Sequence, residues 1–148
     1  MYKVLNKKDI KKLNEDLSYL EVEFSTKDKV ELKDNCYVLN RQTIFIIHNQ
    51  GGENERYLPH LKTNYYANFP SVYVDKGAIR FVVNGADLMV PGISELDEFE
   101  KNNLVVIRDA EHKKALAIGL ASFSSNEIKE MKKGKVIQNL HFVGDKYW

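Results

Sequence analysis

Two basic side chains and two glycines near the middle of the chain have types and spacing that suit chemical work. Lys76 and Arg80 are four residues apart, so on a helix they share one face and can reach phosphates or stack on bases. Gly77 and Gly85 carry no side chain, which lets a phosphate or base come close to the backbone. The competing interpretation is that the basic pair is solvated and that Gly85 merely ends the helix.

Residues that usually carry catalysis or bind metals form no local pattern. The four histidines, at positions 48, 60, 112 and 141, match neither H-x-x-x-H nor H-E-x-x-H, so each is expected to be structural or exposed. Cys36 lies in an expected strand and has no neighbouring base to activate it. Gly51-Gly52 is not followed by the Gly-Lys-Ser/Thr of a phosphate-binding loop. We therefore expect a protein that is not an enzyme and that needs no cofactor or metal.

The overall charge is nearly balanced. The 22 Lys and Arg residues face 21 Asp and Glu residues, a net charge of +1, so any RNA contact must come from a local basic face. Four carboxylates within residues 95–100 indicate a solvated loop or a weak cation site. One cysteine rules out an internal disulfide. No segment resembles a signal peptide or approaches the ~18 apolar residues that cross a bilayer. A cytoplasmic protein without a membrane partner is expected.

The N-terminal half is expected to contain a helix and several short strands. Apolar residues recur at helical spacing across residues 6–20, and Asn6 suits the N-cap. The helix should be followed by strands over residues 22–24, 30–33, 36–39 and 43–48. The run Ile44–Ile47 is apolar on both faces, which favours a central strand. Apolar spacings of three and four within residues 57–69 predict another short helix.

Phe69-Pro70 is the predicted domain boundary, because Pro70 disfavours a helical Phe69 and a new pattern begins there. A helix is predicted from a cap at Asp75 to Asn84-Gly85. A second helix should run from a capping box at Ser124–Glu127 to Gly134. Strands are predicted over residues 72–74, 88–90, 104–107, 116–121 and 136–143. Many short strands with two interspersed helices favour a mixed, partly open barrel.

Ordered blocks in this half resemble a PUA domain. Its opening is similar to V-D-K-G-A-I at residues 74–79 and N-G-A-D-L-M-V-P-G-I at residues 84–93. Its continuation is similar to residues 115–121, 124–128, 133–136 and 139–148. Residues 44–66, which include Gln50-Gly51-Gly52 and Tyr57-Leu58-Pro59-His60-Leu61, resemble the pre-PUA domain of the malignant T-cell-amplified sequence, or translation machinery-associated, family. The chain looks like an archaeal-type member.

This resemblance implies an α+β fold, with a pre-PUA α+β domain over residues 1–69 and a PUA mixed β pseudo-barrel over residues 70–148. Family members bind RNA through the PUA domain, and eukaryotic relatives dock on the small ribosomal subunit beside a SUI1-domain protein. The implied function is RNA binding in translation, on small-subunit rRNA or tRNA, during initiation or recycling. A SUI1-domain partner would have to be a separate protein, or this protein acts without one.

The resemblance also implies which residues face RNA. In PUA domains these come from the first helix, the glycine-containing loop after it and the last strand. Carried over to this chain, they are Lys76, Gly77, Arg80, Asn84, Gly85, Ala86, Asp87, Lys133 and Lys135. Lysines around position 133 also suit a helix C-terminus, with no contact to RNA. The aromatic residues Tyr147 and Trp148 either close the barrel or stack on a base.

Two other functions stay open. The chain could be a non-catalytic RNA-recognition subunit of an RNA-modification enzyme, since PUA domains often accompany catalytic domains. It could also be a protein-interaction module that no longer binds RNA, which agrees with the nearly neutral charge.

Overall fold

The computed structural model describes residues 1–148 and divides the chain into two compact units, Met1–Asn68 and Phe69–Trp148. Each unit has its own sheet. None of the helices combines the length and the apolar character needed to cross a membrane.

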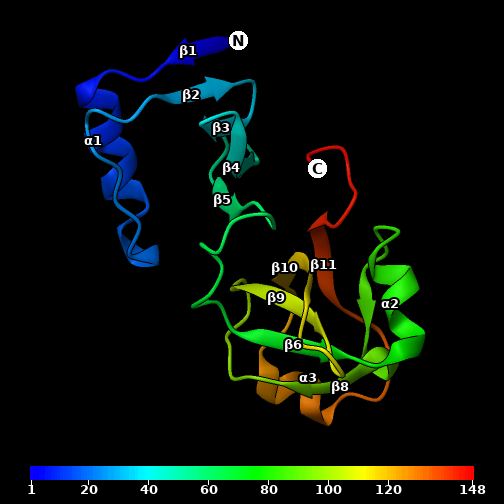
Figure 1. Ribbon diagram of the computed structural model, residues 1–148. Helices are drawn as coiled ribbons and strands as arrows, with labels where there is room; N and C mark the ends of the chain where they lie inside the picture. Colours follow the sequence, from blue (N-terminus) through cyan, green and yellow to red (C-terminus); the bar gives the residue numbers. More distant parts are fainter. The chain divides into compact units, whose positions relative to one another are not determined.

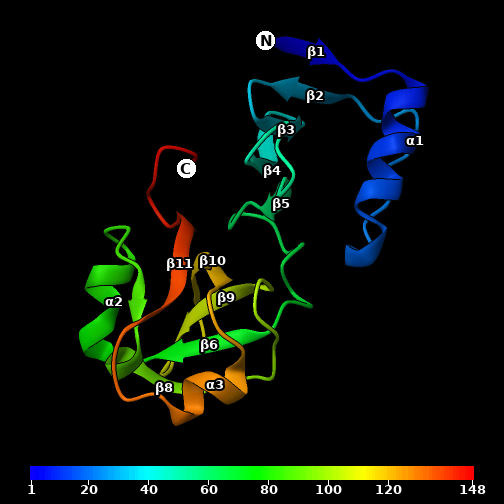
Figure 2. The ribbon, with the colours of Figure 1, turned by 180° about the vertical axis from the view of Figure 1, so that it is seen from behind.

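The first unit is a five-stranded antiparallel sheet with one helix alongside it (Figures 1 and 2). Its elements are β1 (Tyr2–Val4), α1 (Lys7–Asp16), the 3-10 helix η1 (Ser18–Leu20), β2 (Val30–Lys33), β3 (Cys36–Leu39), β4 (Gln42–His48) and β5 (Arg56–Pro59). The strands lie in chain order, and the predicted burial of Ile44–Ile47 on β4 is confirmed. The predicted cap at Asn6 is also confirmed, because its side chain accepts a hydrogen bond of 2.8 Å from the backbone N–H of Asp9.

The predicted strand at residues 22–24 is wrong. Val22 and Phe24 are buried, as their alternation indicated, but the segment has no strand partner. The side chain of Asn14 takes that role. The Phe24 N–H donates to Asn14 Oδ1 over 2.8 Å, and Asn14 Nδ2 donates to the Phe24 carbonyl over 2.9 Å. A single amide thus satisfies the backbone groups that a ladder would otherwise pair.

The predicted helix within residues 57–69 is also wrong. Its first part is β5, where Leu58 pairs with Ile46 of β4, and turns follow. The ring of Tyr65 stacks on Phe45, with centroids 5.2 Å apart. The apolar residues of this segment contact the sheet from a strand and a loop. Over so few residues, their spacing can resemble that of a helix.

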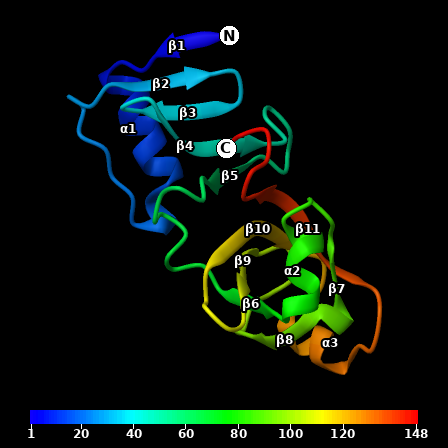
Figure 3. The same cartoon turned by 45° about the vertical axis from the view of Figure 1, so that its right-hand side comes forward.

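The second unit is a nearly closed pseudo-barrel (Figure 3). Its elements are β6 (Ser71–Val74), α2 (Lys76–Val82), β7 (Leu88–Met89), the 3-10 helix η2 (Val90–Gly92), β8 (Ile93–Leu96), β9 (Leu104–Asp109), β10 (Ala115–Ala121), α3 (Ser125–Glu130) and β11 (Lys135–Phe142). The strand order is β7-β11-β10-β9-β6-β8, with only β6 and β9 parallel. Since the edge strands β7 and β8 are joined by η2, the chain itself bridges the seam.

A continuous apolar core fills this barrel. It includes Val72, Val105, Ile107, Val136 and Ile137, all almost fully buried. In a small barrel such buried side chains fill the interior, so that no cavity is left. The structure therefore has the α+β fold with a mixed β pseudo-barrel that the resemblance implied.

Two local predictions for the second unit need correction. The helix expected to reach Gly134 ends at Glu130, because Met131 is already extended (φ −90°, ψ 147°). Lys133 therefore lies beyond the helix. The acidic segment is not all loop, since Glu95 belongs to the edge strand β8 and Asp97 accepts a 2.8 Å hydrogen bond from the Ser71 N–H.

Candidate nucleic-acid interface

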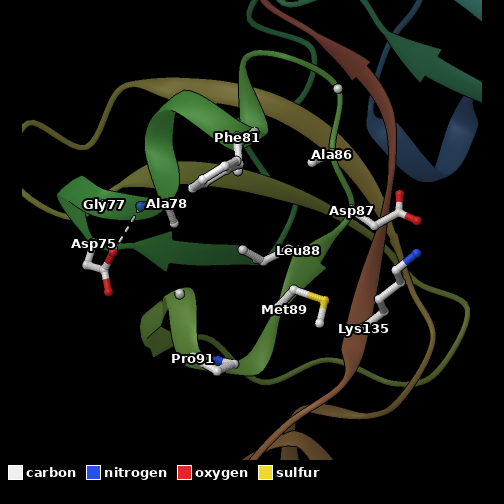
Figure 4. Close-up of a pocket in the computed structure, with 13 residues that line it drawn as sticks. Asp75, Gly77, Ala78, Phe81, Ala86, Asp87, Leu88, Met89, Pro91 and Lys135 are labelled. Atoms are coloured by element: carbon white, nitrogen blue, oxygen red, sulfur yellow. Dashed lines mark hydrogen bonds between the residues drawn. The ribbon is translucent and has the colours of Figure 1, made fainter.

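An open, largely apolar groove of about 740 Å³ lies between α2, the loop after it, β7, η2 and the start of β11 (Figure 4). We refer to it as the α2 groove. Its lining residues are Asp75, Gly77, Ala78, Phe81, Val82, Gly85, Ala86, Asp87, Leu88, Met89, Pro91, Gly92 and Lys135. The charged side chains among these are two carboxylates and one ammonium group. The interior therefore suits a flat apolar group better than a phosphate.

Helix α2 places an exposed aromatic ring on this groove. The helix begins after Asp75, whose Oδ1 accepts a hydrogen bond of 3.1 Å from the Ala78 N–H. Phe81 is 54% exposed, although large apolar side chains are usually buried. The guanidinium carbon of Arg80 lies 4.8 Å from the centroid of the Phe81 ring. This cation–π contact sets a positive charge beside the ring at the rim of the groove.

The loop after α2 is held in place from β11. Asn139 Nδ2 donates to the carbonyls of Val82 and Ala86, at 3.0 and 3.1 Å. The Asn139 N–H donates to Asp87 Oδ1 over 2.9 Å. These three hydrogen bonds connect both ends of the loop to one residue of the neighbouring strand. The wall that the loop forms is therefore already ordered without a ligand.

Two further side chains complete the opposite wall. Met89 is 44% exposed on β7, where it faces the side of the strand opposite to the buried Leu88. Lys135 begins β11 and pairs with Met89 in the sheet. In Figure 4 the Lys135 ammonium group and the Asp87 carboxylate lie at the same end of the groove, away from Phe81. A flexible thioether and a long cationic side chain make this wall adaptable.

The nine residues expected to face RNA separate into two groups. Five of them line the α2 groove: Gly77, Gly85, Ala86, Asp87 and Lys135. The other four, Lys76, Arg80, Asn84 and Lys133, are exposed but do not line it. Asn84 uses its side chain locally, since Nδ2 donates to the Arg80 carbonyl over 2.8 Å. The exposed cations can approach a polyanion from outside the groove, whereas the lining residues can contact only what enters it.

The sequence reasoning missed Phe81 and Met89, the two exposed large hydrophobic side chains that line the groove. A signal for each was present. Phe81 falls outside the helical stripe formed by Ala78, Ile79 and Val82, and Met89 alternates with the buried Leu88. An apolar residue on the polar side of its element is a useful indication of a binding surface.

Comparison with known proteins gives the family. Residues 70–143 match the family model described as the PUA domain. A protein of Methanocaldococcus jannaschii is 36% identical over 97% of this chain and 93% of its own length. Translation machinery-associated protein 20 of Schizosaccharomyces pombe is 37% identical over 83% of this chain and 70% of its own.

Solved structures agree with this assignment. The crystal structure of a hypothetical protein from Pyrococcus horikoshii covers the whole chain, and the chain covers 98% of it, with a TM-score of 0.78 and 28% identity. A chain in the structure of an H/ACA ribonucleoprotein bound to a substrate RNA is also similar, with a TM-score of 0.52 and 28% identity. The match covers 62% of this chain and 30% of that chain. The chain therefore belongs to the PUA-domain proteins, within the translation machinery-associated family that its sequence resembles.

Proposed function

We propose that this protein binds RNA during translation, with the α2 groove as its contact surface. The observation that carries the proposal is the exposed Phe81 ring, which lies in an apolar groove and has the Arg80 guanidinium against it. Stacking of one base on an aromatic side chain contributes about 1–3 kcal/mol to binding. A ring exposed at an apolar groove can stack on a flat partner, and an unstacked nucleobase provides one.

The cations around the groove suit the RNA backbone. Lys76 and Arg80 are exposed on α2, and Lys135 lies at the far end of the groove. A strand whose base enters the groove would keep its phosphates outside, within reach of these side chains. The division between an apolar interior and a basic rim matches the two chemical parts of a nucleotide.

The role in translation rests on the relatives. The Schizosaccharomyces pombe protein is named for its association with the translation machinery, and 37% identity over most of this chain supports a related task. We therefore assign small-subunit rRNA or tRNA as the target, initiation or recycling as the step, and the cytoplasm as the location. The protein acts without catalysis, docks on the small ribosomal subunit, and would work beside a SUI1-domain protein if it needs a partner.

Crosslinking in cells, followed by sequencing of the bound RNA, tests this proposal. The unaltered protein should enrich small-subunit rRNA or tRNA, and Phe81→Ala should remove most of that signal. Tyr19→Ala is the matched control, because Tyr19 is also an exposed aromatic residue but belongs to the first unit. Equal loss of crosslinks in both variants, or no enrichment by the unaltered protein, would contradict the assignment.

A second function has one specific observation in its favour. The likeness to the H/ACA ribonucleoprotein supports a non-catalytic RNA-recognition subunit of an RNA-modification enzyme. That match covers 30% of the other chain, so any catalytic part would come from a separate subunit. Crosslinks concentrated at one modified position of a tRNA, with no ribosomal RNA, would favour this alternative.

A further inference from the structure

Asp87 is a carboxylate in a groove that we assign to a polyanion. A negative charge there repels phosphates and weakens binding unless it meets a hydrogen-bond donor. It lines the α2 groove, and its side chain is partly accessible. The chain supplies no ion-pair partner for it, although Lys135 lies at the same end of the groove.

The two oxygens of this carboxylate have different surroundings. Oδ1 accepts the 2.9 Å hydrogen bond from the Asn139 N–H, which fixes the side chain against β11. Oδ2 accepts no hydrogen bond from the chain. The loop that carries Asp87 is itself held by Asn139 through the carbonyls of Val82 and Ala86. A rigid acceptor with one available oxygen is what discrimination between donors and acceptors requires.

We propose that Asp87 is a specificity-determining residue, which selects a base with an exocyclic amino group in the α2 groove and rejects uracil. This inference rests on the proposed RNA binding. The amino group of cytosine or adenine can donate a hydrogen bond to Oδ2. Uracil presents a carbonyl oxygen at the position where cytosine has its amino group, and two acceptors facing each other repel. Phe81 lies at the other end of the groove, where it can stack on another base of the same strand whatever that base is. The choice of the base that meets Oδ2 therefore falls to Asp87.

A purely structural role is the alternative, in which Asp87 only links the loop to β11. Asp87→Asn separates the two roles because asparagine has the same shape. Its amide oxygen can still accept the hydrogen bond from the Asn139 N–H. Its NH₂ group then replaces Oδ2 and turns the acceptor into a donor. The structural role predicts little change in base preference, whereas the specificity role predicts a reversal.

The test is the affinity of single-stranded oligonucleotides that differ only in cytosine or uracil, measured by fluorescence anisotropy. The unaltered protein should prefer the cytosine strand about tenfold, the effect of one hydrogen bond to a charged group. Asp87→Asn should abolish or reverse that preference. Asp75→Asn is the matched control, since Asp75 lines the same groove and asparagine also caps a helix. This variant should bind each strand more tightly, by the same factor for both, and should keep the preference for cytosine.

The outcomes separate this inference from the proposed function. If the unaltered protein binds both strands equally and Phe81→Ala weakens both, Asp87 does not select the base but the groove still binds RNA. If Asp75→Asn loses the preference for cytosine as Asp87→Asn does, the negative charge of the groove sets the preference and the Oδ2 acceptor does not. The inference is then overturned. If neither strand binds, or Phe81→Ala binds as tightly as the unaltered protein, the proposed RNA groove itself is wrong.

Discussion

Gly85 is the residue whose type is most tightly constrained in the α2 groove. Its φ of +91° lies in the left-handed region, where side chains other than glycine are strained. A Cβ built at this position would lie 2.8 Å from Cε1 of the Phe142 ring. The sequence-based expectation was a glycine that lets a phosphate or base approach the backbone. In the structure, the space that a Cβ of Gly85 would enter is bordered by the Phe142 ring of the same chain.

Gly85→Ala is expected to destabilise the protein by about 2 kcal/mol, because it combines backbone strain with a clash against Phe142. The free energy of unfolding from urea denaturation measures this change. Gly77→Ala is the matched control. Its Cβ would meet nothing closer than Asp75 Oδ1 at 3.5 Å, and its φ is ordinary. We expect no loss of stability there, so similar losses in both variants would refute the constraint at Gly85.

The residue types in the loop after α2 could be predicted from the sequence, but the place of the Phe81 ring beside that loop could not. The glycines, Ala86 and Asp87 belong to a local motif, so a resemblance over residues 84–93 identifies them. Phe81 acquires its place only when β7 and η2 fold against α2 and leave its ring uncovered. A periodic pattern distinguishes buried from exposed positions, but it gives no information on which exposed side chain borders a groove.

At the scale of elements, the correctly predicted strands include some that pair with a sequence neighbour and others, such as β6 and β7, that pair with distant strands. The hairpin of β3 and β4 turns at Asn40-Arg41, both with positive φ, as expected for a tight primed turn. The two failed elements, residues 22–24 and 57–69, depend on distant partners, Asn14 and Phe45. Neither contact leaves a local trace in the sequence.

The turn after β11 is organised by a buried histidine–carboxylate pair. His141 is fully buried, and its Nδ1 lies 2.8 Å from Asp145 Oδ2. Asp145 also accepts hydrogen bonds from the N–H groups of Phe142 and Tyr147. Burial lowers the pKa of His141 below its ordinary value of 6.5, and the nearby Asp145 carboxylate raises it by less. The lowered pKa favours the neutral imidazole in the folded state, and Nδ1 is the ring nitrogen placed to donate to the Asp145 carboxylate.

The burial of His141 is expected to make stability depend on pH. Because the pKa of His141 is lower in the folded state, the unfolded chain binds the proton first, and acidification favours unfolding. Stability should be complete above pH 6.5 and fall as the pH drops below it, with a slope of at most about 1.4 kcal/mol per pH unit for this one group. Urea denaturation between pH 7.5 and 5.5 measures the slope.

His141→Gln should reduce that slope, and a smaller slope should remain because burial also lowers the pKa of His48. His112→Gln is the control, since His112 is an exposed histidine of the same unit. An unchanged slope in His141→Gln, or an equal reduction in both variants, would show that the burial of His141 is not the origin of the pH dependence.

For the whole molecule, the even charge balance determines how binding should respond to salt. A net charge of +1 over 148 residues provides little long-range attraction for RNA. Counterion release must then come from the few cations that contact phosphates, and each one contributes about 0.7 to the logarithmic salt slope for a single strand. The slope therefore reports how many exposed cations face the RNA.

Replacing Lys76 and Arg80 together by alanine should lower the salt slope of RNA affinity by about 1.4, since two phosphate contacts are lost. Titrations of one single-stranded RNA at several salt concentrations give this value. Lys7→Ala with Lys11→Ala is the matched control, because these exposed lysines are also four residues apart on a helix, but in the first unit. An unchanged slope in the α2 variant would remove α2 from the contact surface. An equal fall in both variants would mean that RNA contacts are spread over both units, and the α2 groove would then be only one part of a larger interface.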